Sequence, residues 1–187
     1  MKWRAPLVAG IVGVAVLLLV VLFAISPKGE DAKSVRSPLL GKLVKPLAGT
    51  TISGDEVDID QFRGEWVLIN FFASWCPPCV VEHPELRKLS KDDGGPLQVV
   101  SVVSQDTVKN AREFFAKNGG SWPVLGGDTG PISIDFGLKK VPESFLVAPT
   151  GVVVAKFEGA VTYDEIVKQI EKMSATSETK DSTKGGS

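Results

Sequence analysis

Two cysteines, the only ones in the 187-residue sequence, flank two prolines in the order Cys76, Pro77, Pro78, Cys79. They follow an apolar run over residues 66–73, which predicts a buried strand, and they precede a predicted helix. Residues three apart at the start of a helix share one face, so the two sulfur atoms can form a disulfide within one turn. The unpaired N–H groups at a helix N-terminus favour a thiolate at Cys76, and both prolines suit the first helical turn. The spacing therefore predicts a dithiol that opens and closes.

Three other interpretations of the cysteine pair explain less. A structural disulfide across so short a loop constrains the unfolded chain only weakly. A zinc site needs at least two more ligands, and the sequence has one histidine and no further cysteine. Two unrelated buried cysteines would not need a diproline at a strand-to-helix corner. We therefore expect a redox centre with no metal, and with no cofactor other than the Cys76–Cys79 disulfide itself.

Three segments carry a resemblance to a known family. Residues 70–79, with the sequence NFFASWCPPC, resemble the active-site strand and loop of the thioredoxin superfamily. The continuation at 80–84, VVEHP, resembles the membrane-anchored TlpA/ResA-like and CcmG/DsbE-like branch. Residues 141–147, VPESFLV, are similar to the segment that carries the superfamily's cis-proline. The resemblance covers about residues 38–173, and it implies a thioredoxin-like fold and a thiol-disulfide oxidoreductase.

The two sulfurs are expected to act in turn. Cys76 should be exposed and should attack a substrate disulfide, and Cys79, one turn further in, should then attack Cys76 and release the reduced substrate. The resemblance implies a reductant. An oxidant or an isomerase stays open at this point, because the redox potential sets the direction of exchange.

Cys79 needs an acceptor for its proton. Thioredoxins carry a buried aspartate six residues before the first cysteine, but Asn70 stands there in this sequence, and an amide cannot titrate. Glu82, three residues after Cys79, and Glu143, next to Pro142, match acidic positions of the CcmG-like branch. A partly buried carboxylate has a raised pKa, which suits a proton acceptor near neutral pH. The alternative is that Glu82 is an exposed helix residue and Glu143 a loop charge.

The residues around the dithiol are expected to bind substrate. A cis Val141–Pro142 peptide would set the Val141 backbone against Cys76, where a substrate segment could pair as an added strand. Trp75 would cover the sulfurs and, with the two prolines between the cysteines, offer an apolar contact surface. The single histidine, His83, is expected at the surface beside the site rather than as a ligand.

The N-terminus predicts a membrane anchor. Leu7 to Ile25 is an uninterrupted run of 19 apolar or glycine residues, about 28 Å long as a helix, and the charges of Lys2 and Arg4 precede it. A cleaved signal peptide is the alternative, but its apolar region is typically shorter, about 7–15 residues, and no clear cleavage motif follows. The positive-inside tendency places the catalytic domain on the extracytoplasmic side of a single-pass protein, where disulfide chemistry is common.

We expect four parts in the chain. They are an anchor (1–26), a linker (27–37), a thioredoxin-like domain (38–173) and a disordered polar tail (174–187). Within the domain, periodicity predicts strands at 43–47, 50–59, 66–73, 97–103, 144–148 and 152–157, and helices at 60–63, 79–89, 107–118, 132–136 and 163–173. This order predicts an α/β fold, a central mixed sheet with helices on both faces.

Composition and resemblance narrow the partners. The net charge of −1, from 21 basic and 22 acidic residues, gives no reason to expect nucleic acid. The resemblance implies protein disulfides as substrates, including the haem-attachment Cys-x-x-Cys-His of apocytochrome c in c-type cytochrome maturation, and a membrane thiol donor of the CcdA/DsbD type. General envelope disulfides remain an alternative, as does a non-catalytic binding or chaperone module. A peroxidase would need threonine where Ala73 stands.

Overall fold

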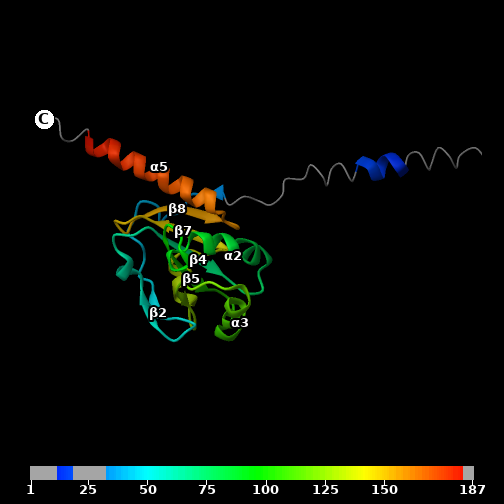
Figure 1. Ribbon diagram of the computed structural model, residues 1–187, viewed down its shortest axis with the longest axis horizontal. Coiled ribbons are helices and arrows are strands. Elements are labelled where there is room, and N and C mark those ends of the chain that lie inside the picture. The colour runs from blue at the N-terminus through cyan, green and yellow to red at the C-terminus, as the bar shows by residue number, and fades with distance from the viewer. Residues whose placement is uncertain (1–11, 19–32, 183–187) are drawn as a thin grey trace, which may run out of the picture. The chain divides into compact units, whose positions relative to one another are not determined.

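A six-stranded sheet forms the centre of the compact unit that contains residues 33–182, as seen in a computed structural model that describes residues 12–18 and 33–182 (Figure 1). Its strands are β1 (Lys33–Ser34), β4 (Val67–Phe72), β5 (Gln98–Val103), β6 (Val124–Leu125), β7 (Glu143–Val147) and β8 (Val153–Glu158). They lie in the order β1-β8-β7-β4-β5-β6. β4, β5 and β6 are parallel to one another, whereas β7 is antiparallel to β4, β8 to β7 and β1 to β8. The predicted mixed sheet is confirmed.

Helices and a small hairpin surround the sheet. They are the hairpin strands β2 (Ala48–Thr50) and β3 (Glu56–Asp58), the 3-10 helices η1 (Ile59–Phe62) and η2 (Lys91–Asp93), and the α-helices α2 (Pro77–Leu89), α3 (Val108–Asn118), α4 (Gly130–Asp135) and α5 (Tyr163–Ser182). One buried cluster joins α2, α3 and α5 to one face of the sheet. A second cluster on the opposite face includes residues of β3, η1 and the end of α4. Both faces are therefore covered, as predicted.

The central strand β4 explains how the site is held. All six of its residues are buried, which fits an apolar strand covered on both sides. Leu68 and Phe72 belong to the cluster with α2, while Ile69 and Phe71 belong to the opposite cluster. Side chains alternate along a strand, so Asn70 points to the α2 side together with Leu68 and Phe72. The strand thus places one polar side chain beneath the helix that follows the dithiol.

The sequence misplaced several shorter elements. Residues 43–47 were predicted as a strand, but Leu43 forms only an isolated bridge with Val152, and the hairpin begins at β2. The linker prediction is wrong for Lys33 and Ser34, which pair with Glu158 and Phe157 as β1. The two-residue strand β6 was not predicted, because so short a run carries no period.

The last helix is longer than the sequence indicated. α5 extends through residues 174–182, which were predicted to be disordered, so this prediction is wrong for that stretch. Ile166 docks the first turns of α5 in the core, and residues added to a helix that has already formed avoid the cost of nucleation. The final residues of the predicted tail, 183–187, lie outside the described part of the chain.

The predicted anchor lies mostly outside the described residues. Residues 12–18, within the apolar run, form a helical segment with exposed side chains. Within residues 12–18 and 33–182, no helix combines the length and the apolar character needed to cross a membrane. The rest of the predicted span, and residues 27–32 of the predicted linker, fall in the undescribed segments.

Candidate active site

Cys76 and Cys79 form a disulfide at the start of α2, with a Cα–Cα distance of 5.3 Å. Cys76 is the N-cap residue, and its sulfur accepts a hydrogen bond from the Cys79 N–H at 3.3 Å. Pro77 and Pro78 occupy the first helical turn, where a missing N–H costs nothing. The predicted placement of the dithiol at a strand-to-helix corner is confirmed.

The predicted exposure of Cys76 is wrong for this oxidised form. Cys76 and Cys79 are each 2% exposed. Both belong to the apolar cluster on the α2 side of the sheet, together with Phe72 and Ala73. The disulfide ties the outer sulfur to the inner one, so both pack against this cluster rather than facing solvent.

An exposed apolar surface surrounds the buried sulfurs. Trp75 is 57% exposed and Val81 is 72% exposed, and both prolines of the motif are also exposed. Unpaired apolar side chains next to a reactive bond are suited to contact a partner protein. An exposed apolar surface therefore lies beside the disulfide, and its role as a contact surface for substrate stays a prediction.

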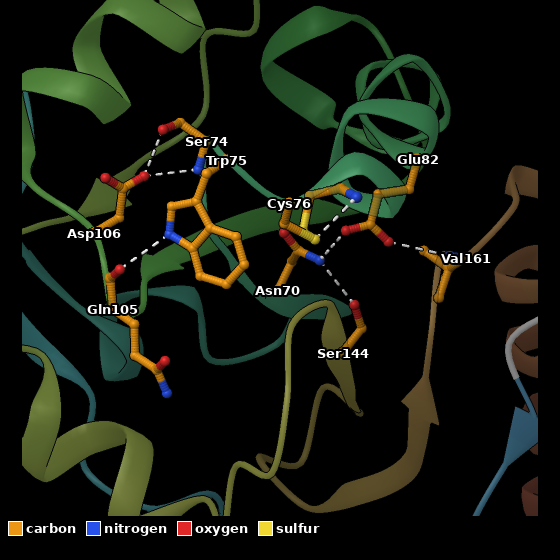
Figure 2. The surroundings of a disulfide bond; sticks show 10 residues. Asn70, Ser74, Trp75, Cys76, Glu82, Gln105, Asp106, Ser144 and Val161 are labelled. Atoms are coloured by element: carbon orange, nitrogen blue, oxygen red, sulfur yellow. Dashed lines mark hydrogen bonds between the residues drawn. A yellow bond between two sulfur atoms is a disulfide. The ribbon is translucent and has the colours of Figure 1, made fainter.

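A clamp formed by Gln105 and Asp106 fixes the loop before Cys76 (Figure 2). The Asp106 carboxylate accepts hydrogen bonds from the Ser74 backbone N–H at 2.7 Å and from the Ser74 hydroxyl at 2.6 Å. The Trp75 indole N–H donates to the Gln105 carbonyl at 3.1 Å. Partial burial acts to raise the pKa of Asp106, but the hydrogen bonds from Ser74, Asn110 and Thr107 together lower it below its ordinary value.

Glu82 lies one turn after Cys79 on α2 and is 1% exposed. Its Oε1 accepts a hydrogen bond from Asn70 Nδ2 at 2.9 Å, and its Oε2 accepts one from the Val161 backbone N–H at 3.1 Å (Figure 2). Burial raises the pKa of Glu82 from 4.5 to about 8, because loss of hydration penalises the charged form more than the two hydrogen bonds stabilise it. The alternative of an exposed helix residue is excluded.

Asn70 connects Glu82 to the strand that follows the cis-proline. Its Nδ2 donates a second hydrogen bond, at 3.0 Å, to the hydroxyl of Ser144 on β7. Asn70 and Ser144 are both fully buried, and they face each other in the β4–β7 ladder. The network thus joins α2, β4, β7 and the segment before α5.

The Val141–Pro142 peptide is cis, as predicted. Pro142 is buried and its carbonyl accepts a hydrogen bond from the Gly159 N–H at 3.0 Å, while Val141 is half-buried and contacts both core clusters. The cis bond turns the chain into β7, one residue before Glu143.

Glu143 has surroundings of a different kind. It is fully buried, and Lys156 Nζ lies 2.9 Å from its Oε2. The same lysine, itself buried, is 3.4 Å from Glu158 Oε1. Because Ser144 faces the Asn70 side of the sheet, Glu143 faces the opposite side, next to Phe145 of the second cluster. The structure therefore separates the two glutamates that the sequence offered as proton acceptors for Cys79.

The expected surface position of His83 is wrong. His83 is 4% exposed and lies among three aromatic rings, with centroid distances of 4.9 Å to Phe114, 5.1 Å to Phe115 and 5.2 Å to Trp122. Its Nε2 is 2.8 Å from the Gly119 carbonyl oxygen. Burial lowers the pKa of His83, so the neutral ring is favoured. α3 packs across this face of α2, which the sequence pattern of α2 alone did not indicate.

Sequence reasoning missed Asp106 and Ser144. Asp106 follows the end of β5, and Ser144 is the second residue of β7, paired with Asn70 of β4. Polar residues after neighbouring parallel strands meet at one edge, and this rule could have identified Asp106. Ser144 was hidden because it sits inside a buried strand. Across residues 12–18 and 33–182, no group of three or more histidine, cysteine, aspartate or glutamate side chains is placed to hold a metal ion.

Comparisons with known proteins agree with this geometry. A family model described as Redoxin matches residues 27–181. The thiol:disulfide interchange protein HelX of Rhodobacter capsulatus is 40% identical over 148 residues, which cover 79% of this chain and 77% of HelX. The thiol:disulfide interchange protein DsbE of Haemophilus influenzae is 31% identical over 137 residues, which cover 72% of this chain and 74% of DsbE.

A solved structure shows the same fold. The crystal structure of a thiol:disulfide interchange protein of the thioredoxin family from Chlorobium tepidum TLS superposes with a TM-score of 0.63 at 20% sequence identity. The match covers 74% of this chain and 98% of that one. At this level of identity the likeness establishes a thioredoxin-like fold.

Proposed function

This chain belongs to the Redoxin family, and we propose that it is a membrane-anchored, extracytoplasmic reductase of protein disulfides in c-type cytochrome maturation. The family and the thiol:disulfide interchange relatives establish the coarser activity, thiol-disulfide oxidoreductase. One observation carries the proposal furthest: the Cys76–Cys79 disulfide caps α2, and Glu82, whose pKa is about 8, is buried one turn beyond it.

The exchange needs a nucleophile and a resolving thiol. In the reduced protein the Cys76 thiolate, favoured by the N-terminus of α2, attacks one sulfur of the substrate disulfide and expels the other as a thiolate. The Cys79 sulfur then attacks Cys76, which re-forms the protein disulfide and releases the second substrate thiolate. Two electrons pass to the substrate, and the two thiolates released take up two protons.

Glu82 is the acceptor for the Cys79 proton in this scheme. The pKa of the Glu82 carboxyl group, about 8, is close to the pKa of an ordinary thiol, about 8.5, so proton transfer between them costs little free energy. Glu82 lies three residues after Cys79, on the same face of α2. Glu143 faces the other side of the sheet beside Lys156, so we assign it to holding the strand after Pro142 rather than to the proton transfer.

The substrate would dock beside the exposed apolar side chains. Trp75, Pro77 and Pro78 offer contact area, and the cis Val141–Pro142 turn offers backbone for an added strand. The Ser74–Asp106 hydrogen bonds support this surface from behind.

The substrate class and the location rest on resemblance. The relative named DsbE supports the branch whose motif implies apocytochrome c, with its haem-attachment Cys-x-x-Cys-His disulfide, as substrate. A membrane thiol donor of the CcdA/DsbD type would reduce the Cys76–Cys79 disulfide after each cycle. The apolar run at 7–25 would anchor the domain of residues 38–173 to the membrane, on its extracytoplasmic side.

Trapping tests the proposal directly. The Cys79→Ser variant, reduced and mixed with an oxidised Cys-x-x-Cys-His peptide, should accumulate a mixed disulfide through Cys76, because nothing remains to resolve it. The Cys76→Ser variant should accumulate far less, and the double variant none, as seen by mass spectrometry under non-reducing conditions. Equal trapping through Cys79 would contradict the assigned roles.

A second candidate is a general reductase of envelope disulfides, which the TlpA/ResA-like part of the resemblance favours. The two candidates differ in selectivity. An apocytochrome reductase should reduce the Cys-x-x-Cys-His peptide at least tenfold faster than a peptide of equal length with an unrelated disulfide. Equal rates would favour the general reductase.

A further inference from the structure

Asn70 carries a buried oxygen without a partner in the oxidised protein. Its side chain is fully buried, and its Nδ2 donates to both Glu82 and Ser144. Its Oδ1 accepts no hydrogen bond from any described residue. A buried carbonyl oxygen without a donor is unfavourable, so an oxygen held in this state needs an explanation.

The orientation of the amide is fixed by its neighbours. Rotating the amide by half a turn would turn Nδ2 away from both of its acceptors, Glu82 Oε1 and the Ser144 hydroxyl. When Glu82 is ionised, the rotation would also place the amide oxygen against the carboxylate, oxygen facing oxygen. Glu82 and Ser144 therefore hold Nδ2 on their side and direct Oδ1 away from them. Figure 2 shows the Asn70 amide beside the disulfide, with its nitrogen directed to Glu82 and Ser144.

The two cysteines lie on the same side of the sheet as the Asn70 side chain. Asn70 faces α2 from β4, and its contact on that helix is Glu82 at 2.9 Å. Cys79 lies one turn before Glu82 on the same helix face and belongs to the same buried cluster as Phe72, the next residue of β4 on that side. In the disulfide, neither sulfur carries a hydrogen, so neither can donate to the amide oxygen.

We propose that Asn70 Oδ1 accepts a hydrogen bond from the Cys79 thiol in the reduced protein, so that Asn70 stabilises the dithiol relative to the disulfide. The inference deepens the proposed reductase, since it concerns the same two sulfurs. Reduction adds two electrons and one proton to the disulfide, breaks the S–S bond and leaves a thiolate at Cys76 and an S–H at Cys79. That S–H supplies the donor that Oδ1 lacks, and reoxidation removes it again when the proton passes to Glu82.

In this arrangement the Asn70 amide oxygen has a hydrogen-bond donor only in the reduced protein. An aspartate at the same position would bind the proton itself, whereas Asn70 can only accept the hydrogen bond of a thiol that keeps its proton. Asn70 thus acts as a hydrogen-bond acceptor for Cys79, and Ser144 and Glu82 act as the residues that position it.

Infrared spectroscopy of the S–H stretch tests the inference. In a Cys76→Ser background Cys79 is the only thiol of the chain, so one S–H band reports on it. A hydrogen bond lowers the S–H frequency, so the band should move to higher frequency when Asn70→Leu, which is nearly isosteric, is added. Ser144→Ala removes one of the two acceptors of Nδ2, while Glu82 remains to hold the amide, so it should shift the band much less. An identical band with Asn70 and with leucine would overturn the inference.

Two further measurements do not depend on one variant folding. In the wild-type protein the Asn70 side-chain carbonyl carbon should move downfield by NMR on reduction, and no movement would overturn the inference. The equilibrium with glutathione should shift about fivefold toward the disulfide in Asn70→Leu or Asn70→Ala, the change expected from one hydrogen bond. Ser144→Ala should shift it less than twofold, and a larger shift there than in the Asn70 variants would contradict the assignment. These readouts need no substrate, so loss of peptide reduction by the wild type would count against the proposed function alone.

Discussion

Two glutamates are buried on opposite faces of the same sheet, and they differ in what surrounds them. Glu82 meets two neutral donors, the Asn70 amide and the Val161 N–H. Glu143 meets a cation, with Lys156 Nζ 2.9 Å from its carboxylate. Both side chains are at most 1% exposed, so burial alone does not distinguish them.

The difference shows that the partner decides what a buried carboxylate can do. Neutral hydrogen bonds offset only part of the cost of burying a charge, so Glu82 keeps a proton up to a pH of about 8 and can exchange it with a thiol. A buried ammonium compensates the charge of Glu143, which fits a structural role next to the cis-proline.

The largest expected effect is a pH dependence of stability that comes from Glu82. The pKa of Glu82 is about 8 in the folded protein and 4.5 in the unfolded chain, so between these values the folded protein binds one more proton. Stability from this group is therefore fully present below pH 4.5 and falls as the pH rises to about 8, by about 5 kcal/mol in total. Urea unfolding of the wild type and of Glu82→Gln from pH 4 to pH 9 measures this effect. The readout is how the difference between their free energies of unfolding changes with pH.

The sign of this effect is its sharpest feature. The glutamine of Glu82→Gln cannot ionise, so the variant lacks this loss of stability. The free energy of unfolding of the variant minus that of the wild type should therefore increase as the pH rises. A matched control is Glu113→Gln, which changes an exposed glutamate of α3 and should add no such slope. A constant difference between wild type and Glu82→Gln across the range would remove the contrast between the two glutamates.

Breaking the ion pair on the other face should cost nearly as much. Lys156→Met leaves the Glu143 charge buried without its cation, which should lower the free energy of unfolding by about 3–5 kcal/mol at pH 7. The double variant Lys156→Met/Glu143→Leu should recover a large part of the loss, since no uncompensated charge remains. The exposed pair Lys109–Glu113 is the control, and Lys109→Met should change stability by less than about 0.5 kcal/mol. A loss as small as the control's in Lys156→Met would show that Glu143 does not depend on its cation.

The chemical consequence of Glu82 should be smaller but selective. Glu82→Gln should slow the resolution of the mixed disulfide by Cys79 about 10²-fold, the usual contribution of a positioned proton acceptor. Stopped-flow quenching with a pre-formed mixed disulfide at Cys76 isolates that step. Glu143→Gln should lower the free energy of unfolding but slow this step much less than Glu82→Gln does. Slower resolution in Glu143→Gln than in Glu82→Gln would exchange the roles of the two glutamates.

A third carboxylate, Asp106, is only partly buried, unlike the two glutamates. Its hydrogen bonds from Ser74 lower its pKa, and it should act as a support for the loop that carries Trp75. Asp106→Ala should cost about 1–2 kcal/mol of stability and raise the KM for a peptide substrate a few-fold, with a smaller change in kcat. A large loss of kcat with an unchanged KM would assign Asp106 to the chemistry instead.

Much of the fold was predictable because the strong signals are local. The apolar run of β4, the proline-containing start of α2 and the hairpin of β7 and β8 follow from periodicity and turn residues. The cis bond at Pro142 followed from the resemblance. β1 and β6 were missed, because two-residue strands gain their order from the neighbouring strand rather than from their own sequence.

The site was predictable in its residues but less so in its environment. Spacing alone placed Glu82 on the same helix face as Cys79. It could not predict that Glu82 is buried, because the burial depends on Asn70 and Val161, which come from distant segments. The same limit explains why His83 was expected at the surface, since α3 supplies the rings that bury it. Contacts over long sequence separations carry no local pattern.

The most direct test of the account is an NMR titration of the Glu82 side-chain carboxyl carbon in the oxidised protein, where neither cysteine titrates. A midpoint near pH 8 is predicted, with Glu82→Gln identifying the resonance. A midpoint near 4.5, the ordinary value for glutamate, would contradict the account, because Glu82 would then be fully charged at neutral pH and a poor match for the proton of a thiol.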